Sequence, residues 1–103
     1  RYALYQADYT FTAAAKADRP KTQTVTVAGR CCESGDLLGE NVPLQEVEPG
    51  DLLAVLCTGA YNYSMASNYN RVPRPPVVMV GQEGARLVVR RETLEDILKN
   101  DLD

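Results

Sequence analysis

Histidine is absent from this sequence of 103 residues, and only 3 cysteines occur in it. Without histidine, no serine or cysteine can act as a nucleophile with an imidazole as its base. A zinc site would lack its usual ligands and spacing, because there is no Cys-x-x-Cys pair, so we expect no metal site. Cys31 and Cys32 are adjacent, which is not the pattern of a disulfide framework and favours a reducing, cytoplasmic compartment.

Long apolar runs, runs of like charge and glycine-rich phosphate loops are also missing. The longest apolar stretches, 52–57 and 75–80 among them, are far shorter than the ~20 residues of a membrane-spanning helix. The chain has 11 basic and 14 acidic residues, for a net charge of -3, and no basic footprint for phosphates. We therefore expect a soluble chain that binds neither nucleic acid nor a membrane. Any catalysis would need an electrophile from outside the chain.

The length fits one domain over residues 1–103, small enough that a partner surface matters. The sequence begins at Arg1 rather than Met, and nothing near its start has the plan of a signal peptide. We interpret it as a piece of a longer chain.

Chemical groups are concentrated in residues 30–36, Arg-Cys-Cys-Glu-Ser-Gly-Asp. A β-rich run ends before them at Gly29 and an apolar pair follows, so we expect a loop held at both ends, a usual place for functional residues. The plainer alternative is a surface turn with one buried cysteine, in which Asp36 braces the loop. A second polar cluster, residues 59–70, favours the functional interpretation.

Hydrophobic periodicity predicts a mostly β chain. Alternation of β-branched residues indicates a strand over 22–28, with weaker strands at 9–12 and 44–48 on either side of it. A turn is expected at 39–43. The apolar run 52–57 predicts a central strand buried on both faces, in which Cys57 is a small buried filler.

Turn and cap signals complete the prediction. Glu48-Pro49-Gly50-Asp51 has the residues of a type II turn, and a glycine-bounded loop joins two β-rich runs, 75–80 and 85–91, into a hairpin. Thr93 is expected to cap a short helix, with Asp96 near the capping-box position. Five or six strands and a C-terminal helix indicate a mostly antiparallel β-barrel or sandwich.

The segment Cys32-Glu33-Ser34-Gly35-Asp36, followed by Gly59-Ala60-Tyr61 and the Ser-Met-Ala-Ser-Asn-Tyr-Asn of residues 64–70, resembles the carboxy-terminal part of the diaminopimelate decarboxylase family. These are pyridoxal-phosphate enzymes of the alanine racemase fold type. The resemblance spans nearly the whole chain and implies an alanine racemase C-terminal-domain-like fold. The (β/α)8 barrel that carries the cofactor lysine is absent from this chain, which is therefore expected to be inactive by itself.

The resemblance also implies roles for particular residues. Cys32 would approach the cofactor of the neighbouring subunit as proton donor, which implies a homodimer. Glu33 would pair with the distal ammonium of meso-diaminopimelate, while Arg1 and Tyr5 would hold its distal carboxylate. Tyr61 would lie beside pyridoxal 5'-phosphate and donate its phenolic hydrogen to the phosphate or the substrate. The product would be L-lysine.

Some residues depart from the family pattern, and other functions stay open. Cys31 stands where relatives often have histidine, and Tyr2 replaces a common proline. Tyr63 and Tyr69 are interpreted as packing or turn residues. One alternative is a decarboxylase of another basic amino acid, such as ornithine, arginine or carboxynorspermidine. The other is a non-catalytic β-barrel binding module whose polar loops contact a protein.

Overall fold

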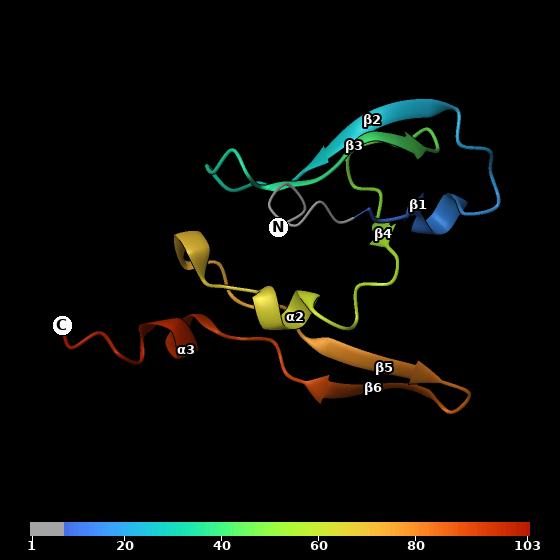
Figure 1. The fold of residues 1–103 in the computed structure, drawn as a ribbon. Helices are drawn as coiled ribbons and strands as arrows, with labels where there is room; N and C mark the ends of the chain where they lie inside the picture. The colour runs from blue at the N-terminus through green and yellow to red at the C-terminus, as the bar shows by residue number, and fades with distance from the viewer. Residues whose placement is uncertain (1–7) are drawn as a thin grey trace. The chain divides into compact units, whose positions relative to one another are not determined.

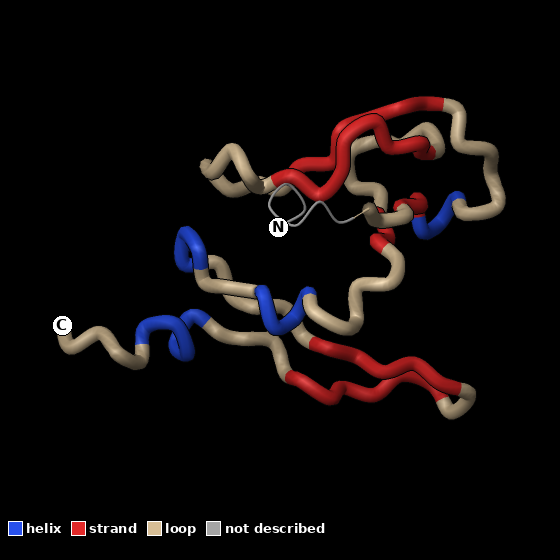
Figure 2. Tube along the Cα trace, in the orientation of Figure 1, coloured by secondary structure: helices blue, strands red, loops and turns tan. Residues whose placement is uncertain are grey.

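The computed structural model describes residues 8–103, and the chain divides into two compact units, one ending at Met65 and one beginning at Ala66. Arg1 and Tyr5, the predicted ligands of a distal carboxylate, lie outside the described residues. Figures 1 and 2 show the elements. The first unit contains β1 (Phe11–Ala13), the 3-10 helix η1 (Ala14–Lys16), β2 (Gln23–Ala28), β3 (Leu37–Leu44), β4 (Leu53–Val55) and α2 (Asn62–Met65), and the second contains the 3-10 helix η2 (Tyr69–Arg71), β5 (Val77–Gly81), β6 (Gly84–Val89) and α3 (Leu94–Leu98).

The strands form three two-stranded antiparallel sheets, β1 with β4, β2 with β3, and β5 with β6. The predicted antiparallel, mostly β content is confirmed. The prediction of a barrel or sandwich is confirmed only in that content: residues 8–103 form no closed barrel, because each strand there pairs with only one neighbour, whereas closure requires that every strand pair on both sides.

A small apolar core lies between β1 and β3 in the first unit. Phe11, only 1% exposed, packs with Val42 and Leu44, and the partly buried Val25 of β2 packs against this group. Gly39 leaves room for the phenyl ring, since a Cβ there would stand 2.9 Å from Phe11 Cε1. The alternation in β2 that predicted this strand therefore turns its valines toward the core.

Two predictions around β3 are wrong. Residues 39–43, expected as a turn, belong to the strand, and residues 45–48 do not form one. Asn41 has a left-handed φ of 54°, and the register with β2 shifts between Val25 and Val27. A β-bulge keeps such residues within a strand, so turn-forming residue types are compatible with β3.

Gln45 shows why the chain leaves β3 after Leu44. Its side chain is 1% exposed and accepts a hydrogen bond from the Ala13 amide at 2.9 Å through Oε1. Its Nε2 donates to Thr12 Oγ1 at 3.0 Å, and Gln23 Nε2 donates to its carbonyl at 2.7 Å. A buried amide needs such partners. Gln45 thus joins β1 to the end of β3 by its side chain.

The strand expected over 52–57 is shorter and more exposed than predicted. Only Leu53–Val55 pair, while the side chains of Leu52 and Leu56 are 75% and 44% exposed. Among the described residues β4 is hydrogen-bonded to β1 alone. Cys57 is exposed and has φ 58°, so its interpretation as a buried filler is wrong.

The turn signal at residues 48–51 is confirmed. The Asp51 amide donates to the Glu48 carbonyl at 3.0 Å, and Gly50 has φ 96°, the positive value that a type II turn requires at its third residue. Asp51 also accepts hydrogen bonds from the Glu48 amide at 2.9 Å and from Lys16 Nζ at 2.9 Å. These two contacts lower the pKa of the Asp51 carboxyl.

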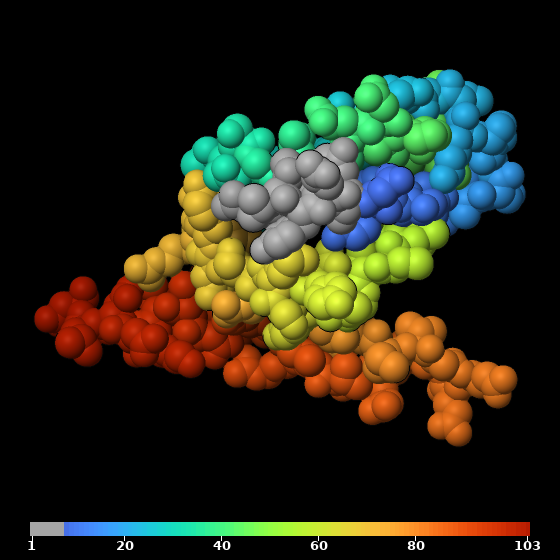
Figure 3. All heavy atoms as spheres, viewed as in Figure 1, coloured from blue at the N-terminus to red at the C-terminus, as the bar shows by residue number. Residues whose placement is uncertain are grey.

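The predicted hairpin is confirmed as β5 and β6, whose last pair is Gly81 with Gly84. Most of its large apolar side chains are exposed on both faces; they are Val78, Met79, Val80, Leu87 and Val88. The hairpin is coloured orange in the space-filling view (Figure 3). Exposed apolar surface of this kind is typical of a region that another surface covers.

The capping box that the sequence predicts before α3 is present. Thr93 Oγ1 accepts a hydrogen bond from the Asp96 amide at 3.1 Å, and Asp96 Oδ2 accepts one from the Thr93 amide at 2.9 Å. Arg90 Nη1 lies 2.9 Å from the same carboxylate. The Arg90 guanidinium, followed by the Thr93 amide, holds the pKa of Asp96 well below its ordinary value of 3.8.

Thr93→Ala is expected to destabilise α3 by about 1 kcal/mol, because the first turn loses its side-chain acceptor. The measurement is hydrogen exchange of the Ile97 amide, which bonds to the Thr93 carbonyl. Thr93→Ser keeps the acceptor and is the control. Equal protection in Thr93→Ala and wild type would mean that the cap contributes nothing.

The contribution of Asp96 to stability depends on pH. Since the folded pKa of Asp96 is below the unfolded one, the stability that Asp96 contributes is present above pH 3.8 and is lost as the pH falls through the lower folded value.

Candidate functional site

Residues 29–36 form a closed loop between β2 and β3, here called the Cys32 loop. Asp36 closes it with three hydrogen bonds: its carbonyl accepts from the Gly29 amide at 2.8 Å, its amide donates to the Glu33 carbonyl at 2.9 Å, and its Oδ2 accepts from the Cys31 amide at 2.9 Å. The predicted loop held at both ends is therefore confirmed, and Asp36 is the residue that braces it.

Two glycines let side chains fold back onto the Cys32 loop. A Cβ at Gly29 would overlap the Asp36 carboxylate, and a Cβ at Gly35 would stand 2.8 Å from Glu33 Oε2. The carboxylates of Asp36 and Glu33 thus occupy the space that a side chain at position 29 or 35 would need. The half-buried Glu33 side chain lies against the loop that carries it.

The two adjacent thiols differ in exposure. Cys31 is half-buried and Cys32 is exposed, and neither is in a disulfide. Partial desolvation, and then the charge of Asp36, raise the pKa of the Cys31 thiol above its ordinary 9.0, so Cys31 stays protonated at neutral pH. Cys32 is the thiol of the pair that a molecule from outside can reach.

Tyr61 lies just before α2, with its side chain 73% exposed. Its carbonyl accepts a hydrogen bond from the Met65 amide at 3.0 Å, which closes the turn of α2. The next residue, Asn62, donates from Nδ2 to the hydroxyl of Tyr9 at 3.3 Å. The backbone of Tyr61 is thus held in the first unit while its phenol remains accessible.

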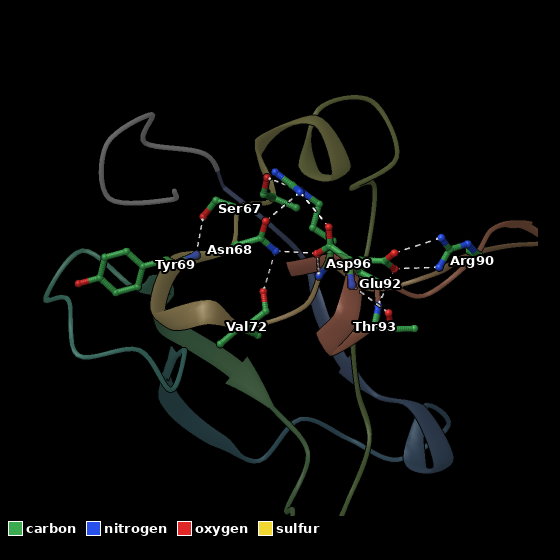
Figure 4. Close-up of polar contacts among 10 residues, drawn as sticks. Ser67, Asn68, Tyr69, Val72, Arg90, Glu92, Thr93 and Asp96 are labelled. Carbon is green, nitrogen blue, oxygen red and sulfur yellow. Dashed lines mark hydrogen bonds and ion pairs between the residues drawn. The ribbon is translucent and has the colours of Figure 1, made fainter. Parts of the chain in front are cut away.

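The second polar cluster divides between the two units, since residues 59–65 belong to the first and 66–70 to the second. In the second unit Asn68 donates from Nδ2 to Glu92 Oε1 at 2.6 Å and to the Val72 carbonyl at 3.1 Å (Figure 4). Arg74 donates to Glu92 through its amide, at 2.8 Å, and its Nη1, at 3.2 Å. The amide of Arg74 and then the side chain of Asn68 lower the pKa of Glu92.

This network encloses a strained turn. Asn70 and Arg71, in η2, have φ of 56° and 58°, a region that residues other than glycine rarely adopt. Arg71 also pairs with Asp101 at 2.9 Å. Sequence reasoning missed the partners of Asn68, because Glu92 lies 24 residues away and no spacing rule connects them.

Within residues 8–103 no group of three or more His, Cys, Asp or Glu side chains could hold a metal ion. Two lysines are engaged in structural contacts: Lys16 Nζ bonds to the Glu46 carbonyl at 3.1 Å and to Asp51, and Lys21 Nζ bonds to the Phe11 carbonyl at 2.6 Å. None of the helices in this part of the chain is long and apolar enough to cross a membrane.

Three of the predicted residues lie among the described residues, in two segments of the first unit. Cys32 and Glu33 are neighbours on the Cys32 loop, and Tyr61 precedes α2. Their side chains carry a thiol, a carboxylate and a phenol. The bracing role of Asp36 was among the interpretations of the sequence, whereas the close approach of its carboxylate to Gly29 was not, although the glycine at the end of β2 was a signal for close packing.

Comparison with known proteins gives one consistent result. The family model described as the pyridoxal-dependent decarboxylase, C-terminal sheet domain, matches residues 1–59. The diaminopimelate decarboxylase of Bacillus subtilis (strain 168) is 60% identical over 102 residues, which is 99% of this chain and 23% of that protein. The chain therefore spans about a quarter of the length of the curated relatives it matches.

Solved structures agree in fold. The crystal structure of diaminopimelate decarboxylase from M. jannaschii in complex with L-lysine has a TM-score of 0.87 and 37% identity, covering 100% of this chain and 23% of that one. The Helicobacter pylori enzyme, also with L-lysine, has a TM-score of 0.79 and 33% identity over 96% of this chain and 24% of its own.

Proposed function

Because this chain belongs to the pyridoxal-dependent decarboxylase family, to its C-terminal sheet domain, we propose that it is the carboxy-terminal β-domain of a diaminopimelate decarboxylase. The complete enzyme would convert meso-diaminopimelate to L-lysine and carbon dioxide. The observation that carries this proposal is the 60% identity to such an enzyme over 99% of the chain. The relatives crystallised with L-lysine bind the product of the same reaction.

We further propose that a barrel domain precedes this domain and carries the cofactor lysine. The chain corresponds to about a quarter of its relatives' length, and Lys16 and Lys21 are already held by carbonyl and carboxylate groups. The exposed apolar side chains of β5 and β6 support a covering surface elsewhere in the enzyme.

Pyridoxal 5'-phosphate, when bound, accepts the electron pair that remains on the substrate carbon as carbon dioxide leaves. A proton must then reach that carbon, and Cys32 is the proposed donor because its thiol is exposed on a braced loop. Tyr61 would hold a phosphate oxygen through its accessible hydroxyl. A thiol, a carboxylate and a phenol can serve as donor and binding groups at such a site. None of them can replace the lysine that binds the cofactor.

Glu33 is proposed to bind the distal ammonium of the substrate. Its carboxylate lies against Gly35 and is half-buried, and it is carried by the same loop as Cys32. A charge-assisted hydrogen bond to an ammonium is stronger than a neutral one. Arg1 and Tyr5 remain the proposed partners of the distal carboxylate, the group that distinguishes diaminopimelate from ornithine and arginine.

Glu33→Gln in the complete enzyme is expected to lower kcat/KM for meso-diaminopimelate. The expected decrease corresponds to a loss of about 2 to 5 kcal/mol in transition-state binding. The physical reason is that the ammonium then enters a partly desolvated site without a negative partner. The measurement is steady-state kinetics of carbon dioxide release. It tests the assignment of Glu33 and, through the substrate used, the proposed activity.

Glu46→Gln is the matched control, because Glu46 is an exposed carboxylate of the first unit that lies outside the Cys32 loop. It should leave kcat/KM unchanged. The isolated 103-residue chain, which lacks the proposed lysine, is the negative control and should release no carbon dioxide. Normal kinetics in Glu33→Gln would refute the assignment, and a wild-type enzyme that acts on ornithine rather than diaminopimelate would refute the proposed substrate.

A further inference from the structure

The brace of the Cys32 loop is a single carboxylate. Asp36 Oδ2 accepts the Cys31 amide at 2.9 Å, while the backbone of Asp36 bonds to Gly29 on one side and to Glu33 on the other. The residues that Asp36 contacts, Gly29, Cys31 and Glu33, precede and follow Cys32 in the sequence. The position of its thiol therefore depends on where the Asp36 side chain lies.

Gly29 leaves the space in which that side chain lies. A Cβ at residue 29 would overlap the carboxylate group of Asp36, so only glycine leaves the space that this carboxylate occupies. The φ of Gly29 is not in the positive range in which glycine is preferred. A larger residue at this position would displace the Asp36 carboxylate from its place, and this effect comes from packing rather than from backbone conformation.

We propose that the Asp36 carboxylate, seated against Gly29, is a positioning group that holds the Cys31 amide and thereby fixes the Cys32 thiol at one place in the decarboxylase site. This inference rests on the proposed function and deepens it. Asp36 acts through Cys32 and is not itself assigned contact with the substrate. What it supplies is a hydrogen-bond acceptor of fixed geometry, so a neutral acceptor of the same shape can replace it.

The test uses the complete, cofactor-loaded enzyme and four variants: Asp36→Ala, Asp36→Asn, Gly29→Ala and the double variant Gly29→Ala with Asp36→Ala. A misplacement of a reacting group by about 1 Å costs about 10²-fold in rate. We expect Asp36→Ala and Gly29→Ala to lower kcat by about that factor with KM little changed. Asp36→Asn retains an acceptor oxygen and should keep most of the activity.

The double variant should be no slower than Asp36→Ala, because the two single changes break the same contact and their effects do not add. Gly81→Ala is the control, since a Cβ at Gly81 meets no atom within 4 Å. Rates are expressed per cofactor-bound site, and the solvent deuterium isotope effect on kcat is measured as well. The isotope effect should rise in the slow variants, because proton delivery becomes slower, whereas a loss of folded enzyme alone would leave it unchanged.

The outcomes separate this inference from the proposed function. Wild-type kcat in both Asp36→Ala and Gly29→Ala, beside a slow Cys32→Ala enzyme, would overturn the positioning role and leave Cys32 as donor. A fast Cys32→Ala enzyme would overturn the donor and the positioning role together. If Asp36→Ala does not fold, Gly29→Ala still decides, and an unchanged isotope effect in a slow Gly29→Ala enzyme counts against the inference.

Discussion

Cys32→Ala in the complete enzyme is expected to lower kcat by about 10² to 10⁴-fold, the usual contribution of a positioned acid or base. KM for meso-diaminopimelate should change little, because the thiol interacts with the substrate carbon only in the transition state, as the carbon receives its proton. The structure supports this role by leaving the Cys32 side chain exposed on a loop that Asp36 braces. Steady-state kinetics over a range of substrate concentrations separates kcat from KM.

Cys57→Ala is the matched control for this experiment. Cys57 is another exposed cysteine of the first unit that forms no disulfide, and it lies outside the Cys32 loop. Its replacement should leave kcat unchanged, which would exclude a general effect of losing a thiol. An unchanged kcat in Cys32→Ala would show that the proton comes from another group.

The features that the sequence predicted correctly depend on residues close together in the chain. The capping box joins Thr93 to Asp96, the type II turn needs Gly50 between its neighbours, and the hairpin closes over a few residues after Gly81. Such local preferences are decided by the backbone and the nearest side chains. The resemblance over nearly the whole chain was confirmed by the family match and by the fold of the solved relatives.

The predictions that were wrong depend on surfaces or contacts far along the chain. The apolar run around β4 predicted burial, but Leu52 and Leu56 are exposed in this chain. Gln45 ends the pairing of β3 because its side chain bonds to the amide of Ala13, 32 residues away. Apolar composition shows that a strand can be buried, and it does not show which surface covers it.

The sequence predicted the part of the candidate site whose residues are adjacent in the chain. Cys32 and Glu33 are adjacent, so the motif that carries the resemblance also places them together. The bracing of their loop depends on Gly29 and on the carboxylate of Asp36, a close approach of side chain to backbone that residue types alone do not reveal. The positions of Arg1 and Tyr5 lie outside the described residues.

The family resemblance implies that the site takes Cys32 and Glu33 from one subunit and the cofactor lysine from the other, and we propose on that ground that the site exists only in a dimer. A two-fold dimer contains two such sites. In a mixed dimer of Cys32→Ala with a variant lacking the cofactor lysine, one site receives both defects and the other receives none. Random exchange of equal amounts gives half mixed dimers, so about a quarter of all sites should be intact.

The most direct test of the shared site is the activity recovered when these two inactive full-length variants are mixed and allowed to exchange subunits. We predict recovery of about a quarter of the wild-type activity. A mixture of Cys32→Ala with Glu33→Gln is the control, because both residues come from the same subunit of each site and no intact site can form. Recovery in the first mixture and none in the control is the predicted result; a first mixture as inactive as its parents, with subunit exchange verified, would contradict a site shared across the dimer.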